Sequence, residues 1–219
     1  MNIILLGPPG CGKGTQALML VKKLNIPSIS TGEALRKEIE KKTAIGLKAK
    51  SYAENGQLVP DEIVINIIKE RILLDDCKKG FILDGFPRNL NQAIELESIF
   101  SKLEKKIDKV LNFEVSEENL VKRISGRFSC KNCGAVYNTF FKPLKKEGFC
   151  DNCNSTQFES RKDDNEETIK SRLIVYNQST LPLIEFYKKK NMLVSINALN
   201  SAEIVFQDIV TSINNNNLI

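Results

Sequence analysis

GPPGCGKGT, residues 7–15, is the stretch of this sequence that decides the fold. It follows a short apolar run, Asn2–Leu6, with the composition of a buried parallel strand, and it leads into Lys13–Leu24, where apolar residues recur at helical spacing. A glycine-rich loop between a strand and a helix is typical of a phosphate-binding loop. The glycines let backbone N–H groups converge on phosphate oxygens, and the helix N-terminus adds partial positive charge. Lys13 is expected to reach the terminal phosphates as a mobile point charge.

One position departs from the general pattern of such loops. Gly14 follows the lysine where serine or threonine is usual, and the hydroxyl comes one residue later, on Thr15. We therefore do not expect the direct bond between hydroxyl and magnesium that GTPases make. The alternative, a glycine-rich turn without a ligand, is disfavoured by the flanking strand and helix and by Lys13 itself. Cys11 is interpreted as a tolerated residue of the loop.

Beyond this loop, short apolar runs alternate with segments of helical periodicity. The runs with the pattern of buried strands are 81–83, 110–115 and 192–196, and the helical segments are 61–77, 90–105, 117–124 and 164–189. The alternation predicts an α/β fold around a central parallel sheet. Residues 30–59, which are mostly helical, and residues 126–163, which hold four cysteines, break this rhythm. We interpret both as insertions into a core domain that spans residues 1–219.

Composition restricts the chemistry and the location. The chain has no histidine and no tryptophan, so an imidazole base and an indole stacking platform are both excluded. Its net charge of +5 suits an anionic ligand without requiring nucleic acid. No apolar run is long enough for a membrane helix, and the opening MNIILL lacks the basic leader of a signal peptide. A cytoplasmic protein without a membrane anchor is therefore expected.

Four of the six cysteines form two C-x-x-C pairs, Cys130 with Cys133 and Cys150 with Cys153. This spacing is a strong signal for structural zinc, since four thiolates fill a tetrahedral shell and leave no open position for chemistry. Disulfides are the alternative, which the cytoplasmic interpretation disfavours. The segment has few large apolar residues, so metal binding is expected to supply folding energy. We expect a small rigid lid, hinged near Gly126 and Asp163.

Five segments together carry a resemblance to a known family: GPPGCGKGTQA, STGEALR, GQLVPDEIV, GFILDGFPRN and RKDDNEETIKSRL. From Asn2 to about Leu193 the chain resembles the nucleoside monophosphate kinases, and among them the adenylate kinases. The resemblance implies a three-layer phosphate-loop fold in which residues 30–59 bind AMP and residues 126–163 form a zinc-stapled lid. It implies reversible, Mg²⁺-dependent transfer of a phosphoryl group from ATP to AMP, giving two ADP, in a monomer that serves adenine nucleotide balance.

The acceptor site is predicted from residue chemistry and from the resemblance. Ser30 or Thr31 is expected to cap a helix, and Arg36, about a turn later, can reach back to a phosphate there. The loop after the strand at 81–83 lies where ligands bind in open α/β sheets. The side-chain amide of Gln92 can pair with adenine N6 and N7. By resemblance, the AMP-binding residues are Thr31, Arg36, Gln57, Leu58, Val59, Gly85, Phe86, Pro87, Arg88, Gln92, Arg161 and Arg172.

The donor site and the transfer step depend on cations. Phosphoryl transfer needs positioning and charge neutralisation more than proton chemistry, which agrees with the absence of histidine. By resemblance, the ATP-binding residues are Gly10, Cys11, Gly12, Lys13, Gly14, Thr15, Arg123, Arg127, Val136, Tyr137 and Asn200. The catalytic residues are, on the same basis, Lys13, Arg88, Arg123, Arg127, Arg161 and Arg172. Asp84 is expected to order the waters around Mg²⁺.

The spacing of these arginines leads to two geometric expectations. Arg123 and Arg127 are four residues apart on a predicted helix, so they are expected to share one face. Arg161 would align with Arg172 if the helix between them extends that far back. The acidic pair at 163–164 either contacts the closing lid or caps the following helix, where negative charge suits the helix dipole.

Two alternative functions remain open at this point. GTP:AMP phosphotransfer is the first, because the choice of donor base often depends on backbone contacts near Asn200. The second is a zinc ribbon that binds nucleic acid, since lysines stand near the cysteine pairs. Against it, the aromatic residues of that segment are not interleaved with basic ones, and the phosphate loop would have no role. We therefore expect ATP, AMP and ADP as partners, with no nucleic acid and no membrane.

Overall fold

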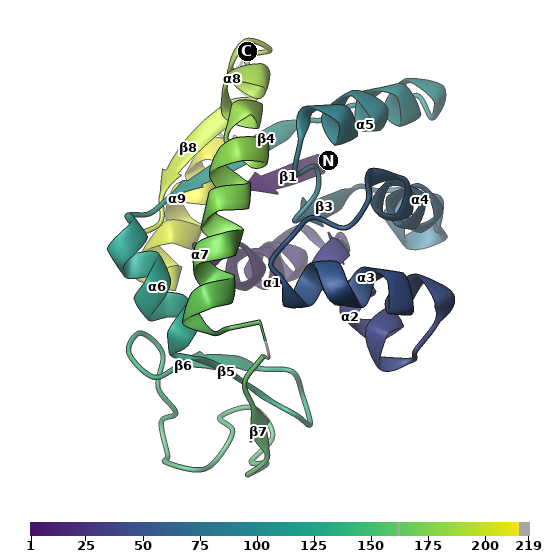
Figure 1. The fold of residues 1–219 in the computed structure, drawn as a ribbon. Coiled ribbons are helices and arrows are strands. Elements are labelled where there is room, and N and C mark those ends of the chain that lie inside the picture. The colour runs from purple at the N-terminus through teal and green to yellow at the C-terminus, as the bar shows by residue number, and fades with distance from the viewer. Residues whose placement is uncertain (162, 215–219) are drawn as a thin grey trace.

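The computed structural model describes residues 1–161 and 163–214, and its centre is a five-stranded sheet (Figure 1). Every neighbouring pair of strands in this sheet is parallel. The predicted α/β fold with a central parallel sheet is therefore confirmed. In spatial order the strands are β2 (Ser28–Ser30), β3 (Phe81–Asp84), β1 (Asn2–Leu6), β4 (Lys109–Glu114) and β8 (Leu193–Asn197).

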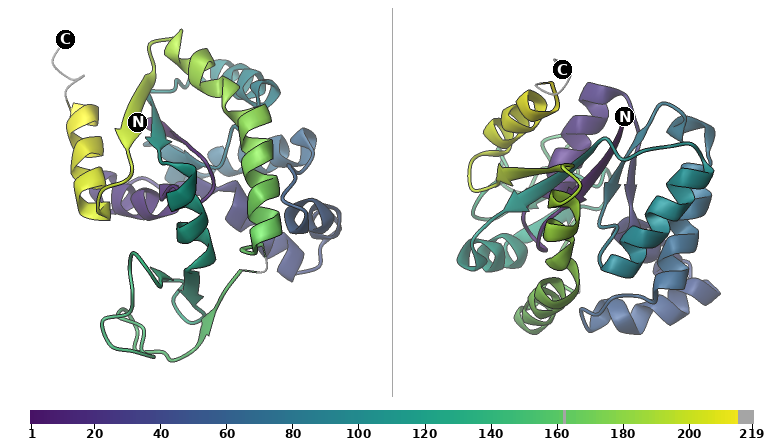
Figure 2. Two further views of the ribbon diagram at one scale, coloured as in Figure 1. Left: turned by 60° about the vertical axis from the view of Figure 1, so that its left-hand side comes forward. Right: turned by 90° about the horizontal axis from the view of Figure 1, so that it is seen from above.

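Alternate residues of β1 face opposite sides of the sheet and contribute to two separate cores. Ile3 and Leu5 pack on the side of α1 and α9, whereas Ile4 and Leu6 pack on the side of α4, α5 and α8. A parallel strand with both faces covered is apolar throughout, as β1 is. The covering helices form three layers with the sheet (Figure 2). They are α1 (Lys13–Leu24), α4 (Asp61–Ile72), α5 (Leu90–Lys102), α8 (Pro182–Lys188) and α9 (Ala202–Asn214).

The first predicted insertion contains two packed helices, α2 (Thr31–Glu40) and α3 (Ala44–Glu54). Thr43 caps α3, because its hydroxyl accepts a hydrogen bond from the N–H of Gly46 at 3.0 Å. The two helices approach so closely that a Cβ at Gly46 would lie 2.0 Å from the carbonyl oxygen of Glu38. Only glycine therefore fits at this position without a shift of the backbone.

The second predicted insertion forms a small antiparallel sheet in the order β6-β5-β7, which projects away from the main sheet (Figure 1). Its strands are β5 (Arg127–Cys130), β6 (Val136–Asn138) and β7 (Phe158–Glu159). The ring of Phe128 stacks on that of Tyr137 with centroids 5.6 Å apart. These rings and three of the cysteines, Cys130, Cys150 and Cys153, belong to a third apolar cluster that is much smaller than the other two.

The long helical segment predicted at 164–189 is divided by a turn of π-helix. It consists of α7 (Glu166–Val175), η2 (Tyr176–Thr180) and α8. The N–H of Leu181 donates to the carbonyl of Tyr176 at 2.9 Å, which is the i→i−5 bond of a π turn. Asn165 is the N-cap of α7, since its side chain accepts from a backbone N–H of the first turn at 2.9 Å.

Two expectations about the arginines are wrong in their geometry. The cap at Asn165 ends α7 before it reaches Arg161, so that residue does not align with Arg172 along one helix. Similarly, α6 (Glu117–Ser125) stops two residues before Arg127, which begins β5 instead of continuing the face of Arg123.

β2 and α9 have no counterpart among the predicted elements. β2 is only three residues long, which is too short for a reliable alternation pattern. The helix expected at 61–77 ends at Ile72 and is followed by a 3-10 helix, η1 (Asp75–Cys77). In the part of the chain that the structure describes, no helix is both long and apolar enough to cross a membrane.

Candidate active site

The phosphate loop lies at the carboxyl end of β1 and leads into α1, as predicted. Gly10 and Gly12 have positive φ angles of 81° and 102°, and a Cβ at Gly10 would lie 2.5 Å from the side chain of Ile124. Glycine is favoured at both positions for this reason. Among the described residues, no side chain caps the first turn of α1, and no acidic residue stands in that turn. The N–H groups of this turn therefore remain available to an anion.

Lys13 folds back across the loop that it follows. Its Nζ donates to the carbonyl oxygens of Gly7 at 2.7 Å and Pro8 at 2.9 Å. The Sγ of Cys11 lies 3.4 Å from the same nitrogen. Cys11 is only 1% exposed and packs in the core beneath the loop, so it has a packing role that exceeds that of a tolerated loop residue.

Asp84 stands beside the phosphate loop at the carboxyl end of β3. Its strand neighbour is Leu5, close to the start of the loop. A Cβ at Gly14 would lie 3.7 Å from the Asp84 Oδ2, so the carboxylate faces the first turn of α1. A carboxylate at this place fits the predicted role of holding waters around a magnesium ion bound to phosphates.

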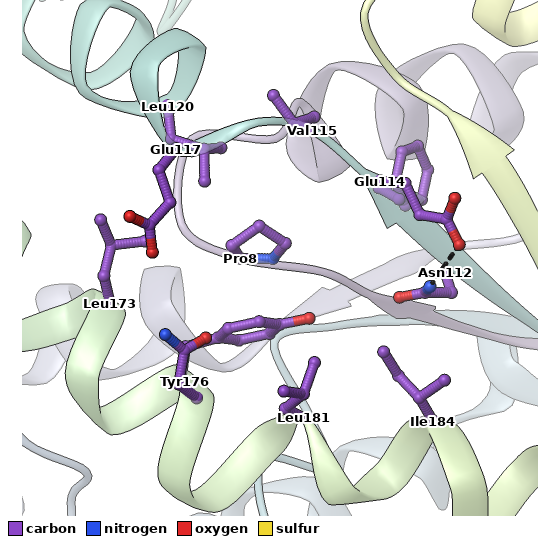
Figure 3. Close-up of a pocket in the computed structure, with 12 residues that line it drawn as sticks. Pro8, Asn112, Glu114, Val115, Glu117, Leu120, Leu173, Tyr176, Leu181 and Ile184 are labelled. Carbon is purple, nitrogen blue, oxygen red and sulfur yellow. Dashed lines mark hydrogen bonds between the residues drawn. The ribbon is translucent and has the colours of Figure 1, made fainter.

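A cavity of about 300 Å³ adjoins the loop between the end of β4 and the helices α6 and α7 (Figure 3). Pro8, Glu114, Glu117 and Tyr176 are among its lining residues. The amide of Asn112 donates to Glu114 at 3.3 Å, and its buried oxygen has no partner among the described residues. Burial raises the pKa of Tyr176 to about 12, so its hydroxyl stays neutral. With two carboxylates in its lining, this cavity is unsuited to phosphate groups.

The loop after β3 meets the start of α2. The Thr31 hydroxyl donates to the carbonyl of Gly85 at 2.8 Å, and the Nε of Arg88 donates to the same oxygen at 2.9 Å. Gly85 has a φ of 79°, and a Cβ there would lie 3.0 Å from the Arg88 guanidinium. Ser30, and not Thr31, is the N-cap of α2. The predicted acceptor residues Thr31, Gly85 and Arg88 are thus brought together.

Gln92 lies in the first turn of α5 and is 1% exposed. Its amide oxygen accepts from the backbone N–H of Arg88 at 2.7 Å. Its Nε2 donates to Asp61 at 2.7 Å. Both ends of the amide are therefore held by the protein, which leaves one N–H and one lone pair for a ligand.

Five guanidinium groups and three carboxylates come together at the carboxyl edge of the sheet. Burial, followed by repulsion from Arg172, lowers the pKa of Arg88 to about 10. Burial, followed by repulsion from Arg127, lowers the pKa of Arg161 to about 10 as well. Counting only residues that the structure describes, five positive charges against three negative ones leave an excess of two, so the cluster favours an anion. Its members are Arg36, Arg88, Arg127, Arg161, Arg172, Asp84, Asp163 and Asp164.

Asp163 and Asp164 pair with arginines of this cluster. Asp164 is 3% exposed and accepts from the Nε of Arg127 at 2.7 Å. Asp163 accepts from Arg172 at 3.0 Å. Since Arg127 begins β5, the pair of Asp164 supports the first of the two expected roles, a contact with the lid. Asp163, by contrast, pairs with Arg172 of α7. Asn165 takes the capping role instead.

Arg123 is directed at the phosphate loop from α6. Its Nη1 donates to the carbonyl of Cys11 at 3.4 Å, and its guanidinium lies 5.3 Å from the ring centroid of Phe141. Burial lowers the pKa of Arg123, which again marks a cation that an anion would stabilise.

The other predicted donor residues lie in the lid and beyond β8. The side chain of Tyr137 is 2% exposed inside the lid, where its hydroxyl accepts from the Asp151 N–H at 2.9 Å. A contact between Tyr137 and a nucleotide would therefore use its backbone. Val136 is half-buried on the same strand, and Asn200 is exposed in the turn between β8 and α9.

Hydroxyl groups near α7 connect it to both halves of the acceptor site, and the sequence carries no signal for them. The Ser171 Oγ donates to the carbonyl of Asn55 at 2.8 Å, next to the predicted adenine-lining segment 57–59. The Thr180 hydroxyl, in the π turn, donates to the carbonyl of Arg88 at 2.7 Å. The continuous helical segment formed by α7 and η2 thus links the position of Arg172 to that of Arg88.

Comparison with known proteins agrees with this geometry. The family model described as adenylate kinase matches residues 5–192. The chain belongs to the adenylate kinase family. It is 54% identical to an adenylate kinase of Caldicellulosiruptor saccharolyticus over 195 residues, which cover 89% of this chain and 90% of that one. It is 51% identical to an adenylate kinase of Archaeoglobus fulgidus over 209 residues, covering 95% and 96% of the two chains. A similar relative from Methanosarcina mazei is 51% identical over the same length.

Membership of the adenylate kinase family settles the reaction class. This chain is an ATP:AMP phosphotransferase, and the phosphate loop and arginine cluster are what such an enzyme requires. The alternative, a zinc ribbon whose main function is to bind nucleic acid, is therefore wrong.

The lid of this adenylate kinase has a donor set that fits a metal ion. The sulfur atoms of its four cysteines all lie within 4.8 Å of one another. The Cys130–Cys153 and Cys133–Cys150 pairs are 3.6 Å and 3.5 Å apart, too long for disulfide bonds. Tetrahedral zinc with bonds of 2.3 Å places its sulfur ligands about 3.8 Å apart, so the arrangement suits zinc.

Proposed function

We propose that this adenylate kinase transfers the terminal phosphoryl group of Mg²⁺–ATP reversibly to AMP, giving two ADP, through the residues assembled at the carboxyl edge of its sheet. The observation that carries the proposal is the meeting of the phosphate loop with a buried arginine cluster of excess positive charge. Such a site binds several phosphates between two nucleotides and needs no histidine.

The donor is proposed to bind at the phosphate loop. Its phosphates would accept hydrogen bonds from the loop N–H groups. They would also attract Lys13, whose Nζ donates to two loop carbonyls in this structure. Arg123 would hold the nucleotide from α6, with Arg127 on the lid side. The further donor contacts are the backbones at residues 10–15, Val136 and Tyr137, and Asn200 beyond β8.

The acceptor is proposed to bind between α2 and the loop after β3. Thr31, Arg36 and Arg88 would bind the AMP phosphate, because their side chains converge on Gly85 and the start of α2. Gln92 would recognise adenine, and the other contacts would come from the segments 57–59 and 85–87.

The transfer itself is proposed to rely on cations. Arg88, Arg161 and Arg172 would neutralise the charge on the migrating group. Burial first, and repulsion from neighbouring arginines second, lower the pKa values of these arginines, and a bound anion would oppose both effects. Mg²⁺, bound with the nucleotide, supplies further charge neutralisation, and Asp84 is the carboxylate placed to hold its waters.

The lid is proposed to carry structural zinc on Cys130, Cys133, Cys150 and Cys153. Residues 126–163 would then move as one rigid body over the donor and exclude water, while residues 30–59 form the AMP-binding unit. We further propose a monomer located in the cytoplasm, with no nucleic acid or membrane as partner.

The proposal is tested by measuring ADP formation from ATP with AMP, UMP, CMP and GMP in turn, in the presence of Mg²⁺. Turnover with AMP alone is the expected result. Replacing ATP by GTP then measures donor preference, and turnover is expected to be much lower with GTP than with ATP. Turnover of UMP or CMP at the rate of AMP would mean that the assignments of Thr31 and Gln92 are wrong.

A further inference from the structure

Asp61 connects the acceptor site to the first turn of α4. Its carboxylate accepts hydrogen bonds from three side-chain amides: Asn89 at 2.9 Å, Asn91 at 2.8 Å and Gln92 at 2.7 Å. Burial acts to raise the pKa of Asp61, but the three bonds together outweigh it and lower the pKa. The group is therefore an ionised carboxylate at neutral pH, which accepts hydrogen bonds and donates none.

This carboxylate, together with the backbone N–H of Arg88, fixes which way the Gln92 amide points. Nε2 faces Asp61, while the amide oxygen faces the backbone N–H of Arg88 at 2.7 Å. A flipped amide would bring its oxygen against the carboxylate and its NH₂ group against the N–H of Arg88. Both contacts would be repulsive, so only one orientation is compatible with the surroundings.

The fixed amide offers a defined pattern to a base. One N–H of Nε2 and one lone pair of the oxygen remain unused, so a matching base presents an acceptor and a donor side by side. Adenine does so with its 6-amino group and the neighbouring N1 or N7. A 6-oxopurine has an acceptor in place of the amino group, which would face the amide oxygen of Gln92.

We propose that Asp61 is a positioning residue that selects 6-aminopurine over 6-oxopurine monophosphates by holding the Gln92 amide in one orientation. The inference rests on the proposed function, in which Gln92 contacts the acceptor base. In this mechanism Asp61 does not contact the base and acts only through Gln92. It lies two residues after the segment 57–59, so the residue that orients the amide is anchored beside the proposed wall of the base pocket.

The test compares Asp61→Leu with the unmodified enzyme, using AMP and inosine monophosphate as acceptors at fixed Mg²⁺–ATP. Leucine has the same number and branching of side-chain heavy atoms as aspartate but accepts no hydrogen bond. One of the two contacts that hold the amide is then lost, and the flipped orientation is opposed only by the backbone N–H of Arg88. The ratio of kcat/KM for AMP to that for inosine monophosphate is expected to fall at least tenfold, which corresponds to about 1.4 kcal/mol. The KM for ATP is expected to stay the same.

Glu62→Leu is the matched control, because Glu62 is the exposed neighbour in the same helical turn. It removes the same charge from the start of α4, and its acceptor ratio should equal that of the unmodified enzyme. Asp61→Asn should retain most of the selectivity, since its amide oxygen can still accept from Gln92. An unchanged ratio in Asp61→Leu would overturn the inference.

Gln92→Leu separates the two levels of the proposal. If Gln92→Leu keeps the acceptor ratio of the unmodified enzyme, the proposed contact between Gln92 and the base is wrong. If Gln92→Leu lowers this ratio and Asp61→Leu does not, the contact is right and the role of Asp61 is wrong. If Asp61→Leu does not fold, Asp61→Ser replaces it. A serine hydroxyl can accept from the amide NH₂ group or donate to the amide oxygen, so it does not select one orientation, and the same loss of selectivity is expected.

Discussion

The pair of Asp164 with Arg127 sets a balance between stability and anion binding that a single substitution can reveal. Asp164 is 3% exposed and Arg127 is 18% exposed, so this ion pair is largely removed from water. Asp164→Asn keeps the shape but leaves five guanidinium groups facing two carboxylates. Breaking a buried pair from one side costs about 3–5 kcal/mol. We expect about 2 kcal/mol here, because Arg127 retains some contact with water and asparagine retains one acceptor.

For a chain of this length, a loss of 2 kcal/mol lowers the melting temperature by about 4–8 °C. The assay is thermal unfolding without ligand and then with tripolyphosphate, a probe that carries no base. Asp164 competes with phosphates for Arg127, so the variant should gain more melting temperature from tripolyphosphate than the unmodified protein does. At a saturating concentration of tripolyphosphate, the difference in melting temperature between the variant and the unmodified protein should narrow.

Glu166→Gln is the control, since Glu166 pairs with Lys170 on the surface and both side chains are more than two-thirds exposed. Its melting temperature should match that of the unmodified protein. If Asp164→Asn melted at the same temperature as the unmodified protein, the carboxylate would not be balancing the arginine cluster. An equal response of both proteins to tripolyphosphate would show that Asp164 does not compete with phosphate.

Three further predictions concern the loop, the lid and the first insertion. Lys13→Met should lower turnover by about 10²-fold or more while the melting temperature changes little; equal losses of folding and activity would instead indicate a structural lysine. Removal of zinc by a strong chelator should lower the melting temperature, with ATP affinity of the loop retained once Mg²⁺ is restored; no change in stability or activity would contradict a structural metal. Gly46→Ala should destabilise the packing of α2 on α3 by about 1–3 kcal/mol and raise the KM for AMP more than that for ATP, which steady-state kinetics and thermal unfolding together check.

The parts of the structure that the sequence predicts well are those determined by neighbouring residues. The strand Asn2–Leu6, the glycine loop and the helix Lys13–Leu24 are found where they were expected, because apolar runs, glycines and helical spacing act locally. The two C-x-x-C pairs were likewise identifiable from spacing alone, and their sulfur atoms do come together.

The errors occur where a single residue or a distant segment decides the outcome. The cap at Asn165 ends α7, and Arg127 enters a strand whose partners lie further along the chain, so helical spacing misplaced both groups of arginines. The hydrogen bonds of Gln92 to Asp61 and to the Arg88 backbone depend on how α4 and α5 pack. A list of adenine-reading residues from sequence therefore includes Gln92 and omits the carboxylate that orients it.

The π turn η2 also sets the rotational phase between two helices that have different tasks. α7 presents Arg172 to the arginine cluster, while α8 buries Leu183 and Tyr187 in the core. The wider turn, with its i→i−5 bond, holds one residue more than an α-helical turn would, and one residue corresponds to about 100° of rotation. Deletion of a single residue from 176–180 would therefore turn one helix relative to the other, so the enzyme would lose either its arginine or its core contacts even though every side chain concerned was still present.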